Sequence, residues 1–174
     1  MKELSLNLLD IARNSIEAGA TSLTLELCET DLKLAVSITD NGSGMDEQTC
    51  RRALDPFFTT RVTRRVGLGL PLLKMRAEMT GGSFSIVSAP GEGTRISADF
   101  IKSAPDFVPL GDIASTVVSI ISASPDLSLR FVHTLPDREV LLDTDLLREK
   151  LEALPLCTPE VLCWISEYLN SQYL

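Results

Sequence analysis

Hydrophobic positions in the first 40 residues follow one helical segment and then two alternating segments. From Leu4 to Ala18 apolar residues recur every three or four positions, which predicts an amphipathic helix. A second, polar stripe runs along this helix, and it consists of Asn7, Asp10, Asn14 and Glu17. Apolar residues then alternate over residues 21–29 and again over 32–40, so we expect two strands paired as a hairpin.

The same reading continues to residue 101. Gly69 to Thr80 has helical spacing, with Pro71 tolerated because it falls in the first turn, and a glycine pair follows it. Two more strands are expected on either side of the turn at residues 89–93. The remaining expectations are a short helix at residues 46–54 and a loop at 55–66.

The stretch at residues 102–110 interrupts this pattern and is the best candidate for a linker. Beyond it, residues 111–174 predict a helix at 112–122, two strands between 127 and 142, and two helices that finish the chain. The alternation of helices and strands predicts an α/β fold for residues 1–101. We expect a small α+β module at the C-terminal side, which is a candidate for binding a partner.

Charge divides unevenly along the chain. The 174 residues carry a net charge of −8, of which residues 101–174 contribute −6. Because affinity for nucleic acid comes largely from neutralising phosphates, this balance argues against nucleic acid as the main partner. Residues 51–76 are the exception: they hold seven basic side chains and one acidic side chain, so a small polyanion could bind there.

Composition excludes two further classes of protein. The 44% hydrophobic content rules out disorder, and no apolar run approaches the roughly 20 residues that span a bilayer. The first residues are too polar for a secretory signal, so we expect a cytoplasmic protein without membrane contact. The four cysteines form no C-x-x-C pair, and we expect them to be buried, reduced thiols.

Three short blocks carry the candidate chemistry. Asp10 and Asn14 are four residues apart on one helix, so both side chains project from one face, where an amide oxygen can bind a hard cation and a carboxylate can orient a water. Asp40-Asn-Gly-Ser-Gly44 follows an apolar strand: its glycines let the backbone approach a flat ligand, and its carboxylate can accept a hydrogen bond from an exocyclic amine.

The third block is Gly67-Leu-Gly-Leu70, which opens a helix. Unpaired N–H groups and the positive end of the helix dipole would face a phosphate there. Arginines precede the block at Arg61, Arg64 and Arg65, and the hydroxyl of Thr94 could reach the same pocket. Each block alone has an ordinary structural explanation, but together, in this order, they indicate an ATP site.

Five motifs in order make the resemblance specific. They are the Asn14 block, Asp-x-Gly-x-Gly at 40–44, Phe-Phe-Thr-Thr-Arg at 57–61, Gly-Leu-Gly-Leu at 67–70 and Gly-Glu-Gly-Thr at 91–94. Residues 1–101 therefore resemble the ATP-binding domain shared by gyrase, the heat-shock chaperone ATPases, histidine kinases and MutL, the GHKL superfamily.

This resemblance implies a Bergerat fold, an α/β sandwich in which helices cover one face of a mixed sheet. By the family pattern, Asn14 would ligate magnesium and Asp40 would bind the adenine amino group. Gly42, Gly44 and Thr94 would shape the base pocket. The phosphates would lie against residues 67–70, namely Gly67, Leu68, Gly69 and Leu70, with Arg61 nearby, and residues 59–66 would form the ATP lid.

Two departures from the family pattern shape the expected function. The position of the usual catalytic Glu is Asp10, one methylene shorter, so we expect Asp10 to serve as the base of a slow ATPase or nucleotide-dependent switch. A histidine kinase also needs a phosphoacceptor histidine upstream of the Asn14 helix, whereas the one histidine here, His133, lies in an alternating strand and is expected to be structural. Two alternatives stay open: an anti-sigma-like serine/threonine protein kinase, and a non-catalytic nucleotide sensor. A protein partner and a homodimer are further expectations.

Overall fold

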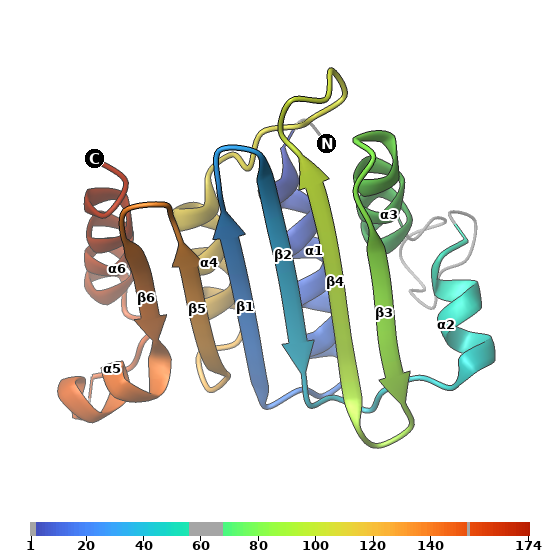
Figure 1. Cartoon of the computed structure of the whole chain (residues 1–174). Helices are drawn as coiled ribbons and strands as arrows, with labels where there is room; N and C mark the ends of the chain where they lie inside the picture. The colour runs from blue at the N-terminus through green and yellow to red at the C-terminus, as the bar shows by residue number, and fades with distance from the viewer. Residues whose placement is uncertain (1–2, 56–67, 153) are drawn as a thin grey trace.

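The computed structural model describes residues 3–55, 68–152 and 154–174, and its centre is one mixed sheet. Six strands lie in the order β3-β4-β2-β1-β5-β6, with helices against one face (Figure 1). The strands are β1 (Ser22–Glu29), β2 (Lys33–Asp40), β3 (Phe84–Ala89), β4 (Gly93–Ile101), β5 (Ser128–Thr134) and β6 (Glu139–Asp143). The helices are α1 (Leu4–Glu17), α2 (Glu47–Ala53), α3 (Gly69–Met79), α4 (Ile113–Ala123), α5 (Thr144–Leu151) and α6 (Pro159–Ser171).

Local turns explain most of the strand pairing. The β1–β2, β3–β4 and β5–β6 pairs are antiparallel neighbours in sequence, each closed by a short connection, and β2 pairs antiparallel with β4. β1 and β5 run parallel, with Leu25 opposite Phe131, and a parallel pair needs a long crossover. The long stretch of chain between β1 and β5 supplies it, so β5 reaches the free edge of β1.

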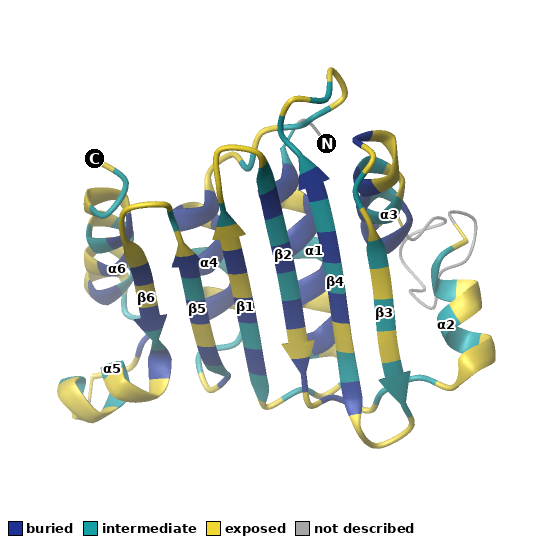
Figure 2. Cartoon of the chain, viewed as in Figure 1, coloured by how far each residue is buried: buried dark blue, intermediate teal, exposed yellow. Residues whose placement is uncertain are grey.

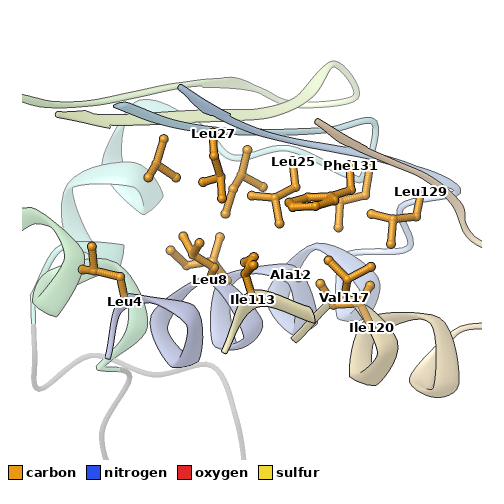
Figure 3. Packing of buried hydrophobic residues seen from close by; sticks show 14 of the residues in the cluster. Leu4, Leu8, Ala12, Leu25, Leu27, Ile113, Val117, Ile120, Leu129 and Phe131 are labelled. Atoms are coloured by element: carbon orange, nitrogen blue, oxygen red, sulfur yellow. The ribbon is translucent and has the colours of Figure 1, made fainter. Parts of the chain in front are cut away.

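The core lies between the sheet and α1, α3, α4 and α6. Strand residues alternate between buried and exposed along the sheet (Figure 2), as expected when one face is covered and the other is open. In Figure 3 the strand residues Leu25, Leu27, Leu129 and Phe131 face side chains of α1 and α4. Phe100 and Phe131 have no measurable exposure, and both belong to this one cluster. The expected α/β sandwich with helices on one face is confirmed.

The segment between β4 and α4 is fastened to the start of α1. The N–H of Leu4 donates to the carbonyl of Pro109 at 3.0 Å, and the N–H of Ser5 donates to that of Leu110 at 2.8 Å. The hydroxyl of Thr116 in α4 donates to the carbonyl of Ser5 at 3.3 Å. Residues 111–174 thus extend the sheet and the helical layer that residues 1–101 begin. The division into a domain at residues 1–101, a linker at 102–110 and a partner-binding module at 111–174 stays a prediction.

The expectation of buried cysteines is wrong. All four thiols are free, but Cys28, Cys157 and Cys163 are exposed and Cys50 is half-buried. The reason for Cys28 is its place on β1: the residues on either side of it in the strand, Leu27 and Glu29, point toward the helices, so Cys28 points to the open face of the sheet. No helix among the described residues combines the length and the apolarity needed to cross a membrane.

Candidate nucleotide-binding site

Asp40, at the end of β2, is a buried carboxylate held from two sides. Its side chain is 8% exposed, its Oδ2 accepts a 2.6 Å hydrogen bond from the hydroxyl of Ser15 in α1, and its Oδ1 accepts a 2.8 Å bond from the N–H of Gly42. An ionised carboxylate has about four acceptor positions, so two bonds leave acceptor capacity for a ligand. The carboxylate is therefore oriented but not saturated.

Gly42 is packed tightly enough that a side chain there would have to push its neighbours aside. A Cβ there would lie 3.0 Å from Asp40 Oδ1 and 3.1 Å from the carbonyl oxygen of Ala18. The neighbouring Ser43 N–H donates to the same carbonyl at 2.9 Å. The loop after β2 is thus drawn against the end of α1, and this contact places the backbone beside the Asp40 carboxylate.

Gly44 and Gly93 allow two backbones to touch. Both have a positive φ, 65° and 79°, which glycine adopts without steric strain. A Cβ on Gly44 would lie 1.9 Å from the carbonyl oxygen of Ala89, and one on Gly93 would lie 2.0 Å from that of Asp40. The loop after β2 and the β3–β4 turn are consequently in direct backbone contact.

Ser88 joins the same two segments through hydrogen bonds. Its hydroxyl accepts from the N–H of Met45 at 2.8 Å, donates to the carbonyl of Gly93 at 2.8 Å, and lies 2.9 Å from the hydroxyl of Thr94. Thr94 is the register partner of Asp40 in the β2–β4 pairing. The structure therefore brings Asp40, Gly42, Gly44 and Thr94 together, as the motif order indicated.

On the other side of the site, α1 meets the start of α3. The carboxylate Oδ2 of Asp10 lies 2.7 Å from the position that a Cβ of Gly69 would take, so any larger residue at position 69 would displace the Asp10 side chain. Asn7, one turn earlier and fully buried, donates from its side-chain amide to the carbonyl of Gly69 at 3.4 Å. Its Oδ1 accepts a 2.5 Å bond from Arg76 of α3. Hydrogen bonds of Asn7 to Gly69 and Arg76 therefore hold α1 against α3.

At the amino end of α3, some backbone N–H groups precede the first hydrogen bond within the helix. That bond runs from the N–H of Leu72 to the carbonyl of Leu68 at 3.0 Å. The N–H groups of Gly69 and Leu70 precede it, and Pro71 has no N–H. The Leu70 side chain belongs to the core, whereas Leu68 is 40% exposed. Because a leucine side chain has no hydrogen-bond donor, either residue can contact a phosphate only through its backbone.

The structure describes only some of the remaining predicted residues. Asn14 is exposed on α1, one turn after Asp10. Arg61, Gly67 and the expected lid at residues 59–66 lie outside the described residues. His133 is 1% exposed, with its Nδ1 2.9 Å from the Tyr173 hydroxyl, and its position is that of a structural side chain.

Sequence reasoning missed three positions in and around this site. The sequence pattern placed Ser15 on the apolar face of α1, Ser88 in a strand and Asn7 in a polar stripe, but it gave none of them a role in the site. A serine on the apolar side of an amphipathic helix was the available signal for Ser15, since a buried hydroxyl requires a partner. Ser88 and Asn7 had no comparable signal, because Ser88 contacts Met45 43 residues away in sequence and Asn7 contacts Arg76 69 residues away.

The fold is an α/β sandwich with helices on one face of the sheet. Its site combines a buried carboxylate, a glycine loop at a strand end, and a helix amino end that faces the polar side of α1. These features together define a nucleotide-binding module. The family model for histidine kinase-, DNA gyrase B- and HSP90-like ATPases matches residues 1–104, and the chain belongs to this family. It therefore contains a GHKL-type ATP-binding module.

Curated relatives are similar over the same segment. The histidine-protein kinase AtoS of Escherichia coli is 34% identical over 93 residues, which is 53% of this chain and 15% of that protein. Sporulation kinase D of Bacillus subtilis is 31% identical over 99 residues, 56% of this chain and 19% of the kinase. The match thus spans less than a fifth of either relative. The crystal structure of the N-terminal domain of a DNA repair protein has a TM-score of 0.57 at 12% identity, covering 82% of this chain and 53% of that one, and shows the fold alone.

The residues present fit a nucleotide. Asp40 offers an acceptor for an exocyclic amine, and the backbone around Gly42 and Gly44 leaves no room for side chains that would cover the carboxylate. The N–H groups at the start of α3 are donors for phosphate oxygens. Mg²⁺ usually takes one or two protein oxygens and keeps several waters, and the Asn14 side-chain oxygen is of the type that it binds.

Proposed function

We propose that this protein binds ATP together with Mg²⁺ and acts as a slow ATPase or nucleotide-dependent regulatory switch. The observation that carries the proposal is the Asp40 carboxylate, which is 8% exposed, held by Ser15 and Gly42, and left with unused acceptor capacity. A buried carboxylate needs donors. The exocyclic amine of adenine supplies one.

Magnesium is assigned to Asn14. Its exposed side chain lies one turn from Asp10 on α1, and the Asp10 carboxylate lies against Gly69 at the amino end of α3, where the phosphates would be. A cation between Asn14 and the phosphates would complete this arrangement. We expect Asn14→Ala to remove the magnesium dependence of ATP binding while the fold persists, because alanine is the better helix former.

Hydrolysis is assigned to Asp10 as the group that orients or deprotonates water. A side chain shorter than Glu leaves the carboxylate farther from its water, and a misplacement near 1 Å can lower a rate about a hundredfold. We therefore expect slow turnover, which suits a switch. Phosphate release by the wild type and by Asp10→Asn tests this step: equal rates in the two proteins would remove Asp10 as the base.

The decisive experiment is calorimetric titration with ATP and Mg²⁺ of the wild type, Asp40→Asn and Asp99→Asn. Loss of one charge-assisted hydrogen bond costs about 1.5–3 kcal/mol, so Asp40→Asn should weaken ATP about ten- to a hundredfold. Asp99 pairs with Lys33 and Ser83 outside the site, so Asp99→Asn should bind like the wild type. Undiminished binding by Asp40→Asn would overturn the proposed function.

An assay of the products of ATP separates the three candidate functions, which are ATPase, protein kinase and nucleotide sensor. Radiolabelled ATP yields free phosphate with an ATPase, a labelled protein with a protein kinase, and neither with a sensor. Hydrogen exchange with and without an ATP analogue tests the expected lid at residues 59–66, where we expect protection on binding.

A further inference from the structure

Helix α6 presents an exposed aromatic and acidic surface at the opposite end of the sheet from α3 (Figure 1). The surface consists of Pro159, Glu160, Cys163, Trp164 and Glu167, which together line a shallow hollow of about 450 Å³. We call it the α6 outer face. The inner side of the same helix, with Val161, Ile165 and Leu169, is buried in the core.

The aromatic part of this surface is held in place. Trp164 is 51% exposed, and its ring stacks on that of Tyr168 with centroids 5.7 Å apart and planes 12° apart. The Tyr168 hydroxyl donates a 3.2 Å bond to the carbonyl of Leu141 in β6. Because the supporting ring is anchored to the sheet, Trp164 is an ordered platform rather than a loose surface side chain.

The acidic part has no internal counter-ion. Glu160 and Glu167 are exposed, one turn before and one turn after Trp164, and neither forms an ion pair within the described part of the chain. No lysine or arginine follows Lys150 in the sequence. The positive amino end of the α6 dipole stabilises a negative side chain at Glu160, in the first turn of the helix. It does not reach Glu167 in the third turn.

We propose that the α6 outer face binds an arginine side chain presented by a protein partner. A guanidinium is planar and weakly hydrated, so it can stack on the free part of the indole while its N–H groups donate to the flanking carboxylates. An ammonium would make the ionic contact without the stacking. Glu167 accepts only a weak 3.6 Å hydrogen bond from the Cys163 thiol, and neither acid has an ion-pair partner in the described part of the chain. The combination of one exposed tryptophan with these two carboxylates therefore selects arginine over lysine, and a cation over an apolar side chain.

Charge also argues against a second copy of this chain bound by the same face. Symmetric pairing of two α6 outer faces would bring four carboxylates together without a cation, and like charges at an interface oppose association. The occupant must instead bring positive charge. This inference is independent of ATP binding, because the surface shares no residue with the nucleotide site.

The single tryptophan of the chain reports directly on this surface. We would titrate the full-length protein with a short peptide that carries two arginines, and with matched peptides in which lysine or citrulline replaces arginine, while following Trp164 fluorescence. The arginine peptide should change the signal at the lowest concentration, the lysine peptide should bind more weakly, and the neutral citrulline peptide should not bind.

Variants locate the contact. Exposed ion pairs contribute little individually, so the double change Glu160→Gln and Glu167→Gln should weaken the arginine peptide by about tenfold. The control, Glu149→Gln, removes an exposed acid on α5 away from this surface and should leave binding within about twofold of the wild type. Circular dichroism checks that each variant is folded.

Three results would overturn the proposal. Equal binding of the citrulline peptide would show an apolar rather than a cationic site. A fluorescence change on concentrating the protein alone, accompanied by self-association in sedimentation, would assign the face to a second copy. No response to the arginine peptide, or an unaltered response in the double variant, would leave the α6 outer face without this role.

Discussion

The two ends of the sheet bury polar groups in different ways. At the nucleotide end, the Asp40 carboxylate accepts two hydrogen bonds and keeps acceptor positions unused. At the C-terminal end, the Thr144 hydroxyl uses its single donor and one of its two acceptor positions: it accepts from the N–H of Leu129 at 2.8 Å and donates to the carbonyl of Leu127 at 3.0 Å. Both residues are buried, but the Asp40 carboxylate keeps more acceptor capacity unused than the Thr144 hydroxyl does.

The environment of His133 extends this contrast. Its Nδ1 lies 2.9 Å from the Tyr173 hydroxyl, and Glu29 Oε2 lies 3.4 Å from Nε2 in an electrostatic contact that is not a well-formed hydrogen bond. Glu29 also accepts a 2.7 Å bond from Lys102. This cluster ties the end of the chain to β1 and β5. Burial alone therefore does not mark a functional group.

The largest effect should come from Gly44→Ala. Its Cβ would lie 1.9 Å from the Ala89 carbonyl oxygen at a φ of 65°, so the loop must leave the β3–β4 turn. We expect a loss of about 3 kcal/mol or more in the free energy of unfolding and a fall of more than about a hundredfold in ATP affinity. Urea unfolding and calorimetry measure the two quantities.

Gly91→Ala is the matched control. Gly91 lies in the neighbouring turn with a φ of 80°, but nothing lies within 4 Å of its Cβ position. The substitution should cost only the backbone strain of about 1 kcal/mol and leave ATP affinity nearly unchanged. Equal losses in both variants would contradict the role of backbone contact at Gly44.

Asn7→Ala should come next. It removes the acceptor of the Arg76 bond and the donor to Gly69. The guanidinium keeps its 3.2 Å bond to the carbonyl of Glu3 but loses a bond to a buried acceptor, and we expect a loss of about 2–3 kcal/mol in stability. Because Asn7 positions the amino end of α3, the affinity for ATP should fall more than that for adenosine. A parallel loss for both ligands would mean that Asn7 only supports the fold.

Ser15→Ala and Thr144→Val compare the two ends directly. Ser15→Ala deletes one hydrogen bond to Asp40, so ATP should bind about three- to tenfold more weakly with a stability loss near 1 kcal/mol. Thr144→Val deletes two bonds at the other end and should lower stability by about 2 kcal/mol without changing ATP affinity. Weaker ATP binding by Thr144→Val would show that the two ends are coupled.

The smallest effect concerns pH. Burial lowers the pKa of His133 below its ordinary value of 6.5, against the opposing influence of Glu29. The unfolded chain then binds a proton at a higher pH than the folded chain, so stability contributed by the neutral imidazole is complete above about pH 6.5 and declines as the pH falls below it. Urea unfolding between pH 7.5 and 5 should show this slope, and His133→Gln should reduce it.

Much of the architecture follows from local pattern. The order of helices and strands agrees with the periodicity along residues 4–171, because each element buries one face and its spacing records which positions are apolar. The blocks at residues 40–44 and 67–70 also indicated an ATP site. The structure places the backbone of Gly42 against Asp40 and that of Gly44 against the β3–β4 turn, and the roles of these residues in binding stay predictions.

Only the tertiary structure decided how distant elements meet. The parallel pairing of β1 with β5 joins residues about a hundred positions apart, and no local turn specifies it. The Ser15–Asp40 bond, the Asn7–Arg76 clamp and the contact of Gly44 with Ala89 likewise depend on how helices pack on the sheet. The physical reason is that periodicity records which face of an element is buried, whereas the partner on that face is chosen by packing and by the pairing of buried polar groups.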